Sequence, residues 1–283
     1  MIFALTTNKG KNMTNPITVG TSWHQQSIVR ACERLQLAQP HAHLIDLPNA
    51  DGTIKSVTTA TAILFEKLNE GVTLLMVHQK WKKGALAFPG GFRAGAPEDK
   101  HDRSTTEQKE NEEFFPLLTA ARELSEEVPF MFQSQSGDTL KKIYEFLNDG
   151  STQTVRNSGW NQFPVLNYVR QLLQDQTKMI DKALRGDSDI SVVNEEVTEI
   201  SRISLAVLKQ AFASQKWTKE GLECRAKLIS EASARSEKAD LKDFKQYEQQ
   251  ISLINTLGKT VVMTDFTARS IFNSLDEIER LTA

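Results

Sequence analysis

Three glutamates on one predicted helix are the side chains in this sequence best spaced for chemistry. A step of about 100° per residue over 117–128 gathers four apolar side chains into one stripe: Leu117, Ala121, Leu124 and Val128. The same step places Glu123, Glu126 and Glu127 together on the opposite side, with Arg122 beside them. Like charges at this spacing repel each other, and acids near the C-terminal end of a helix oppose its dipole.

A bound divalent cation would remove this repulsion. Mg²⁺ and Mn²⁺ prefer hard oxygen ligands, and they take one or two protein carboxylates together with the phosphate oxygens of a substrate. The ordinary alternative is an acidic helix face that contacts only solvent. Three glutamates alone do not decide between these interpretations, so the elements that precede the helix have to be considered.

Two predicted strands and a glycine turn come before the helix. The segments 57–65 and 72–77 are rich in β-branched and apolar residues, which predicts a strand pair joined by a short polar connection. The stretch 84–92 is a brief strand that runs into Pro-Gly-Gly at 89–91. Because glycine has no Cβ, the backbone carbonyls and amides of this turn can approach a ligand closely.

Together these features resemble the Nudix hydrolase family. The family's box reads G-x(5)-E-x(7)-R-E-U-x-E-E-x-G-U, where U is a bulky apolar residue. Residues 86–92 (Leu-Ala-Phe-Pro-Gly-Gly-Phe) look like its beginning, and residues 120–130 (Ala-Ala-Arg-Glu-Leu-Ser-Glu-Glu-Val-Pro-Phe) look like its second half. The likeness covers residues 57–130 well and continues thinly to Leu208.

This box is longer than the family pattern and ends differently. Twenty-three residues separate Glu98 from Arg122, where the family has seven, and the segment 97–115 holds seven acidic residues against three basic ones. An inserted loop costs little, because closure entropy grows only logarithmically with length. Pro129 occupies the position of the family's late glycine. The first box glutamate stays open: Glu98, Glu112 or Glu113 could each take this position, or none of them does.

The resemblance implies a role for each matching residue of the box. Glu126 and Glu127 would be the main metal ligands, and Glu123 would be a further ligand or the base that activates water. Arg122 would orient a glutamate through a charge-assisted hydrogen bond. Gly90 would offer its carbonyl to the metal and lie next to the phosphate.

Residues outside the helix complete the expected site. Many family members carry another glutamate on a later loop, and three residues are candidates here: Glu195, Glu196 and Glu199. Glu196 is the preferred one, and the equally weighted alternative is that these are exposed acids at a strand edge. Gly91 in the turn and Arg93 just after it would contact the phosphates of the substrate.

The reaction that the resemblance implies is attack of water on a phosphorus atom. The substrate would be a nucleoside diphosphate linked to another moiety, such as ADP-ribose or a dinucleotide, and the cofactor would be Mg²⁺ or Mn²⁺. The alternative is a Nudix-like regulator or binding module that senses a nucleotide without turnover. A capped RNA end is the one nucleic acid that fits this chemistry, and a homodimer stays open. The sequence does not identify the nucleotide or the phosphorus atom attacked.

Composition sets outer limits on function. The chain has 283 residues, of which 39% are hydrophobic, and 34 Lys and Arg against 36 Asp and Glu give a net charge of −2. This balance provides no global basic field for binding the many phosphates of a nucleic acid. No apolar run approaches the ~18 residues that a membrane span needs. We therefore expect a cytoplasmic protein that does not enter a membrane.

The expected fold class is α/β (α+β), a Nudix-like α/β/α sandwich with a mixed, curved sheet plus extra helices. The predicted organisation is an N-terminal extension (1–50), a Nudix core (51–215) with insertions at 97–115 and 131–190, and a C-terminal helical segment (216–283) packed on the core. Further helices are expected over 27–37, 139–147, 164–184, 205–212, 221–257 (with breaks) and 265–281, the last capped by Asp265. Further strands are expected near 192–203 and 260–263.

Overall fold

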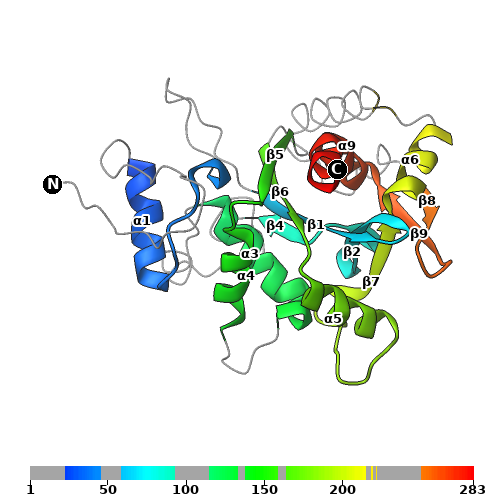
Figure 1. Cartoon of the computed structure of the whole chain (residues 1–283), viewed down its shortest axis with the longest axis horizontal. Helices are drawn as coiled ribbons and strands as arrows, with labels where there is room; N and C mark the ends of the chain where they lie inside the picture. Colours follow the sequence, from blue (N-terminus) through cyan, green and yellow to red (C-terminus); the bar gives the residue numbers. More distant parts are fainter. Residues whose placement is uncertain are drawn as a thin grey trace, which may run out of the picture.

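The chain folds around one mixed sheet that has helices on both faces (Figure 1). The computed structural model describes residues 23–45, 59–92, 115–132, 138–158, 164–214, 218, 221 and 250–283. Figure 1 shows α3, α4 and α5 on one side of the sheet and α6 and α9 on the other. The expected α/β sandwich with a mixed sheet is thus confirmed.

The sheet is built around β1 (Thr59–Leu68). This strand pairs antiparallel with β2 (Gly71–Gln79) and parallel with β6 (Pro164–Gln171), while the short β4 (Gly90–Phe92) pairs with the first residues of β1. The other strands are β3 (Ala85–Ala87), β5 (Gln153–Ser158), β7 (Val197–Ser204), β8 (Gln250–Ile254) and β9 (Thr260–Thr264). The order is β5-β6-β1-β2-β3-β9-β8, with β7 paired to β2. The predicted strand pair is confirmed.

Helices and 3₁₀ turns connect these strands. The helices are α1 (Trp23–Leu35), α3 (Pro116–Glu127), α4 (Thr139–Leu147), α5 (Gln174–Leu184), α6 (Leu205–Ser214) and α9 (Asp265–Thr282). The 3₁₀ turns are η1 (Ala42–Leu44), η2 (Lys80–Lys82) and η3 (Pro129–Phe132). No helix in the described parts of the chain is both long enough and apolar enough to cross a membrane.

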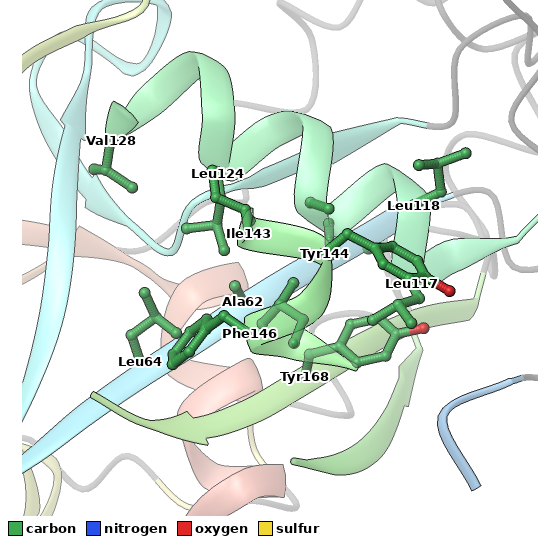
Figure 2. Packing of buried hydrophobic residues seen from close by; sticks show 14 of the residues in the cluster. Ala62, Leu64, Leu117, Leu118, Leu124, Val128, Ile143, Tyr144, Phe146 and Tyr168 are labelled. Carbon is green, nitrogen blue, oxygen red and sulfur yellow. The ribbon is translucent and has the colours of Figure 1, made fainter. Parts of the chain in front are cut away.

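Two apolar cores lie on opposite faces of the sheet. Alternation along β1 sends Ala62 and Leu64 into the core under α3 and α4, and Ile63 and Phe65 into the core under α6 and α9. Figure 2 shows the first of these cores, where Leu124 of α3 faces β1. Since both faces of β1 are buried, the position of α3 is fixed against the centre of the sheet.

The prediction of a single helix over 164–184 is wrong. The structure has strand β6 over Pro164–Gln171, and helix α5 begins at Gln174. Leu166 and Tyr168 pack in the core beneath α3, whereas Val169 packs in the opposite core. A strand buried on both faces has an almost continuous apolar run, and such a run cannot be distinguished from a buried helix by periodicity.

The C-terminal segment contains the strand expected near 260–263, as β9, and also β8, which lies where the sequence predicted helix. Its described part contains the antiparallel hairpin of β8 and β9, and β9 joins β3 in parallel through Leu86 and Met263. Residues 222–249 of the helix expected over 221–257 lie outside the described residues. Thr264 rather than Asp265 occupies the N-cap position of α9, and its side chain makes no capping hydrogen bond. The division into core and extensions stays a prediction, but the segment 216–283 contributes two strands to the sheet.

A buried ion pair links β1 to β7 across β2. Arg202 of β7 and Glu66 of β1 are both buried and form an ion pair, in which Nη2 of Arg202 donates to Oε2 of Glu66 over 3.1 Å. The hydroxyl of Thr73 also donates to Glu66, over 3.0 Å, and Asp181 of α5 forms a second ion pair with Arg202. Each charge is therefore compensated inside the protein.

We expect Arg202→Met to lower the free energy of unfolding by about 3–5 kcal/mol, because Glu66 would be left buried without its cation. Urea unfolding measures this loss. The control is Lys209→Met, which breaks the exposed pair with Glu279 and should cost less than about 1 kcal/mol. Equal losses in the two variants would contradict the role given to the buried pair.

Candidate functional site

Helix α3 places its apolar stripe against the sheet, as predicted. All four residues of the stripe are fully buried: Leu117, Ala121, Leu124 and Val128. The helix begins with Pro116 at its first position, where the missing N–H is not needed. The last helical residue is Glu127, so the predicted acidic residues occupy the final turn and a half.

The acidic side of α3 is not the exposed face that an acidic surface helix would have. Glu123 is 6% exposed and Glu127 is 1% exposed, and of the three predicted glutamates only Glu126 lies in solvent. Removing a carboxylate from water is unfavourable unless it is protonated, paired or hydrogen-bonded. The burial of two neighbouring carboxylates therefore needs a physical explanation, whereas carboxylates on a solvated face would need none.

A third carboxylate comes from a distant part of the chain. Carboxylate oxygens of Glu123, Glu127 and Glu196 lie within 4.8 Å of one another. Glu196 is exposed and precedes β7, where Val197 pairs with Gln79 at the end of β2. The amide of Lys80 also donates to the carbonyl of Glu196 over 2.8 Å. Strand pairing between β2 and β7 thus carries Glu196 to the end of α3.

The other predicted acids lie elsewhere. Glu126 is not part of this cluster, and its Oε2 accepts a bond of 2.8 Å from Nη1 of Arg122. Nη2 of the same guanidinium donates to Oε1 of Glu123 over 2.6 Å. Glu195 is exposed, and Glu199 pairs with Lys259 at 2.6 Å. Among the three later glutamates, Glu196 is therefore the one that joins the cluster.

Two strands hold the carboxylate of Glu127. Nε2 of Gln79 donates to Oε1 over 2.7 Å, and the amide of Gly90 donates to Oε2 over 3.1 Å. The amide of Gly90 thus contacts Glu127, and the metal contact expected of its carbonyl stays a prediction. Sequence reasoning missed Gln79, since a lone glutamine at the end of a strand matches no motif.

The two glycines of the turn leave room for the helix. A Cβ on Gly91 would lie 2.4 Å from Oε1 of Glu123, and one on Gly90 would lie 2.5 Å from the carbonyl oxygen of Ala60. Side chains at these positions would collide with the carboxylate and with β1 respectively. The turn therefore lies very close to α3 and β1, and the close approach to a ligand expected of Pro-Gly-Gly stays a prediction. Arg93 and the open positions Glu98, Glu112 and Glu113 lie outside the described residues.

Burial changes the protonation of both buried carboxyls. Desolvation raises the pKa of Glu123 to about 8 against the opposing charge of Arg122. Desolvation also raises the pKa of Glu127 to about 7, opposed by the hydrogen bond from Gln79. The neighbouring carboxylate of Glu196 raises both values further. Without a cation, the cluster therefore holds protons near neutral pH.

The donor set fits a hard divalent cation. Three carboxylates converge, and Oε1 of Gln79 is a buried oxygen without a hydrogen-bond partner among the described residues. Mg²⁺ and Mn²⁺ take such oxygen ligands and offset carboxylate repulsion. Glu196 is the exposed member, so the cluster is open to solvent on its side.

The solved structures that are similar to this chain include the following two. One is the NUDIX domain of Shewanella oneidensis NrtR complexed with ADP ribose, at 15% identity over 57% of this chain and 81% of that chain, with a TM-score of 0.29. The other is a C. elegans Ap4A hydrolase binary complex, at 12% identity over 62% of this chain and 96% of that chain, with a TM-score of 0.30.

Sequence comparisons give no further relative. No protein-family model matches the chain, and no curated protein matches it. Both solved structures are under 25% identical to the chain and both TM-scores are below 0.5, so neither carries an argument about its function. The function of this chain is accordingly inferred from the geometry of its own residues.

In the absence of divalent cations, we expect the free energy of unfolding to fall as the pH rises from about 5 to about 8. Glu123 and Glu127 have raised pKa values in the folded protein, about 8 and about 7, against about 4.3 for an unfolded glutamate. The folded state thus binds more protons across this range. Urea unfolding in EDTA should show a shallower pH dependence for the double variant Glu123→Gln, Glu127→Gln. An equal pH dependence of the unfolding free energy in the wild type and the double variant would contradict the raised pKa values.

We expect Gly91→Ala to weaken Mn²⁺ binding by about 10–100-fold, the effect typical of disturbing the surroundings of a metal ligand. The new Cβ would displace the carboxylate of Glu123, which is the flexible end of a side chain, so thermal stability should change little. Electron paramagnetic resonance of free Mn²⁺ measures the affinity. Gly150→Ala is the control, since nothing lies within 4 Å of a Cβ there. Unchanged affinity in Gly91→Ala would contradict this geometry.

Proposed function

We propose that this chain is a Nudix hydrolase that requires Mg²⁺ or Mn²⁺. It would cleave a pyrophosphate bond in a nucleoside diphosphate linked to another moiety, such as ADP-ribose or a dinucleotide. The observation that carries the proposal is the convergence of Glu123, Glu127 and Glu196, two of them buried. The resemblance of the box at 86–92 and 120–130 supports the same chemistry.

Burial of the two glutamates favours a metal site over a structural cluster. Arg122 compensates one of the buried carboxylates, and neutral donors bind the other. A buried charge that served only stability would be replaced by an apolar group at little cost. A cation bound by Glu123 and Glu127 would offset the desolvation and the repulsion together. A bound metal would therefore explain why two carboxylates are buried next to each other.

Each residue of the cluster has a distinct part in the proposed reaction. When bound, the divalent cation neutralises phosphate charge and lowers the pKa of a coordinated water. Gln79 and Gly90 orient Glu127 as a ligand, and Arg122 orients Glu123. We assign proton acceptance to Glu196, in addition to its place in the ligand set, because its side chain is the exposed one that water can reach.

Residues at the rim have supporting parts. Glu126 holds Arg122 through their ion pair of 2.8 Å. Its proposed part is therefore to orient the guanidinium of Arg122, and it is not proposed as a main ligand of the metal. Lys82 lies close enough for its charge to lower the pKa of Glu127, and a cation there is suited to the phosphates of a substrate. Gly91 and Arg93 stay proposed as contacts of the phosphates.

We expect Glu196→Gln to lower kcat by about 10²–10⁴-fold, the range typical for loss of a general base, and Glu127→Gln to remove activity while the protein stays folded. The assay is release of nucleoside monophosphate with Mn²⁺ from ADP-ribose, NADH, dinucleoside polyphosphates, sugar nucleotides and capped RNA. Glu195→Gln is the control, since Glu195 is the exposed neighbour outside the cluster.

The outcomes separate the enzyme from the alternative. Wild-type turnover by Glu127→Gln would overturn the proposed mechanism. Nucleotide binding in calorimetry, without any product after long incubation with Mn²⁺, would favour a nucleotide-sensing module instead. Activity that depends on the metal and on Glu127 would support the hydrolase.

A further inference from the structure

Asn194 uses both ends of its side-chain amide to join two parts of the candidate site. Its Nδ2 donates to the carbonyl oxygen of Glu126 over 3.0 Å and to that of Glu127 over 3.1 Å. Its Oδ1 accepts from the amide of Glu196 over 2.9 Å and from that of Val197 over 2.8 Å. One side chain thus binds the end of α3 and the loop that carries Glu196.

The two sets of bonds satisfy different needs of the backbone. Carbonyls in the last turn of a helix have no partner within the helix, and the amide nitrogen of Asn194 serves two of them. Its oxygen binds amides two and three residues ahead, which fixes the loop in a local turn. The consequence is that the Cα positions of Glu127 and Glu196 are tied through a single residue.

Other contacts of this loop act on its backbone. Nζ of Lys80 donates to the carbonyl of Asn194, and the amide of Asn194 donates to the carbonyl of Val197 over 3.1 Å. Val192 packs against the core, but side-chain packing contributes little over 193–196, since Val193 is 60% exposed and both Glu195 and Glu196 are exposed. A loop with few apolar contacts opens easily unless hydrogen bonds hold it. Asn194 is therefore well placed to determine where Glu196 lies.

We propose that Asn194 is a positioning residue that holds Glu196 at metal-binding distance from Glu127 and thereby sets the affinity of the cluster for a divalent cation. This inference rests on the proposed metal site and adds a residue to it that touches neither the metal nor the substrate. It differs from a purely structural helix cap, which would affect stability without changing metal affinity.

The test is Mn²⁺ binding to the metal-free protein, followed by electron paramagnetic resonance. We expect Asn194→Ala to bind Mn²⁺ about 10–100-fold more weakly than the wild type. Asn148→Ala is the matched control, because Asn148 also uses both ends of its amide, accepting from the amide of His41 over 2.9 Å and donating to the carbonyl of Gln39 over 3.0 Å. It lies outside the glutamate cluster, so its affinity should equal that of the wild type.

A second variant separates positioning from stability. Asn194→Asp keeps the oxygen that accepts from Glu196 but loses the donor to the end of α3. Its added negative charge would by itself tighten cation binding. Weaker Mn²⁺ binding in this variant therefore supports the tether, whereas equal or tighter binding overturns it. This comparison decides the matter even if Asn194→Ala does not fold.

The remaining outcomes distinguish this inference from the proposed function. If the wild type binds no Mn²⁺, the proposed metal site fails and the positioning role fails with it. If the wild type and both Asn194 variants bind equally well, only the positioning role fails. Thermal unfolding of each variant shows whether Asn194→Ala and Asn148→Ala lose similar stability, in which case a difference in affinity cannot come from stability alone.

Discussion

The burial of the Glu127 carboxylate is the constraint on which the rest of the candidate site depends. Its two oxygens accept hydrogen bonds from Gln79 on β2 and from Gly90 on β4, so the end of α3 is bound to two strands at once. A buried carboxylate that lost these donors would be strongly unfavourable. Helix α3 therefore cannot shift along the sheet without loss of stability, and Glu123 is held in place by the same restraint.

The sheet brings the third carboxylate to this fixed point. Antiparallel pairing of β7 with β2 continues as far as Gln79 and Val197, and the loop before Val197 contains Glu196. The buried pair of Arg202 and Glu66 holds β7 in register deeper in the sheet. A slip of one residue would turn every side chain of β7 to the opposite face. The convergence of the three carboxylates is thus a consequence of strand register, including the register shift between His78 and Gln79, together with the turn at Asn194.

Local patterns predicted some elements and missed others. The stripe on α3 follows from helical periodicity, and the pair of β1 and β2 follows from two short runs rich in β-branched and apolar residues with a polar connection between them, although both strands are almost entirely buried. Strand β6, which also packs into both cores, was predicted as helix because no glycine or proline separates it from the sequence of α5. Strand β8 has only five residues with alternating burial, too few for the surrounding charged sequence to reveal a strand.

The sequence by itself determined the helix, the side of it that carries the three glutamates, and the glycine turn that precedes it. These are local properties, because helical spacing alone decides which side chains share a face. Only the tertiary structure decided that Glu123 and Glu127 are buried while Glu126 is not, and that Glu196 joins them. The reason is that burial and convergence depend on which distant strands cover a face, and strand pairing over more than a hundred residues leaves no local pattern.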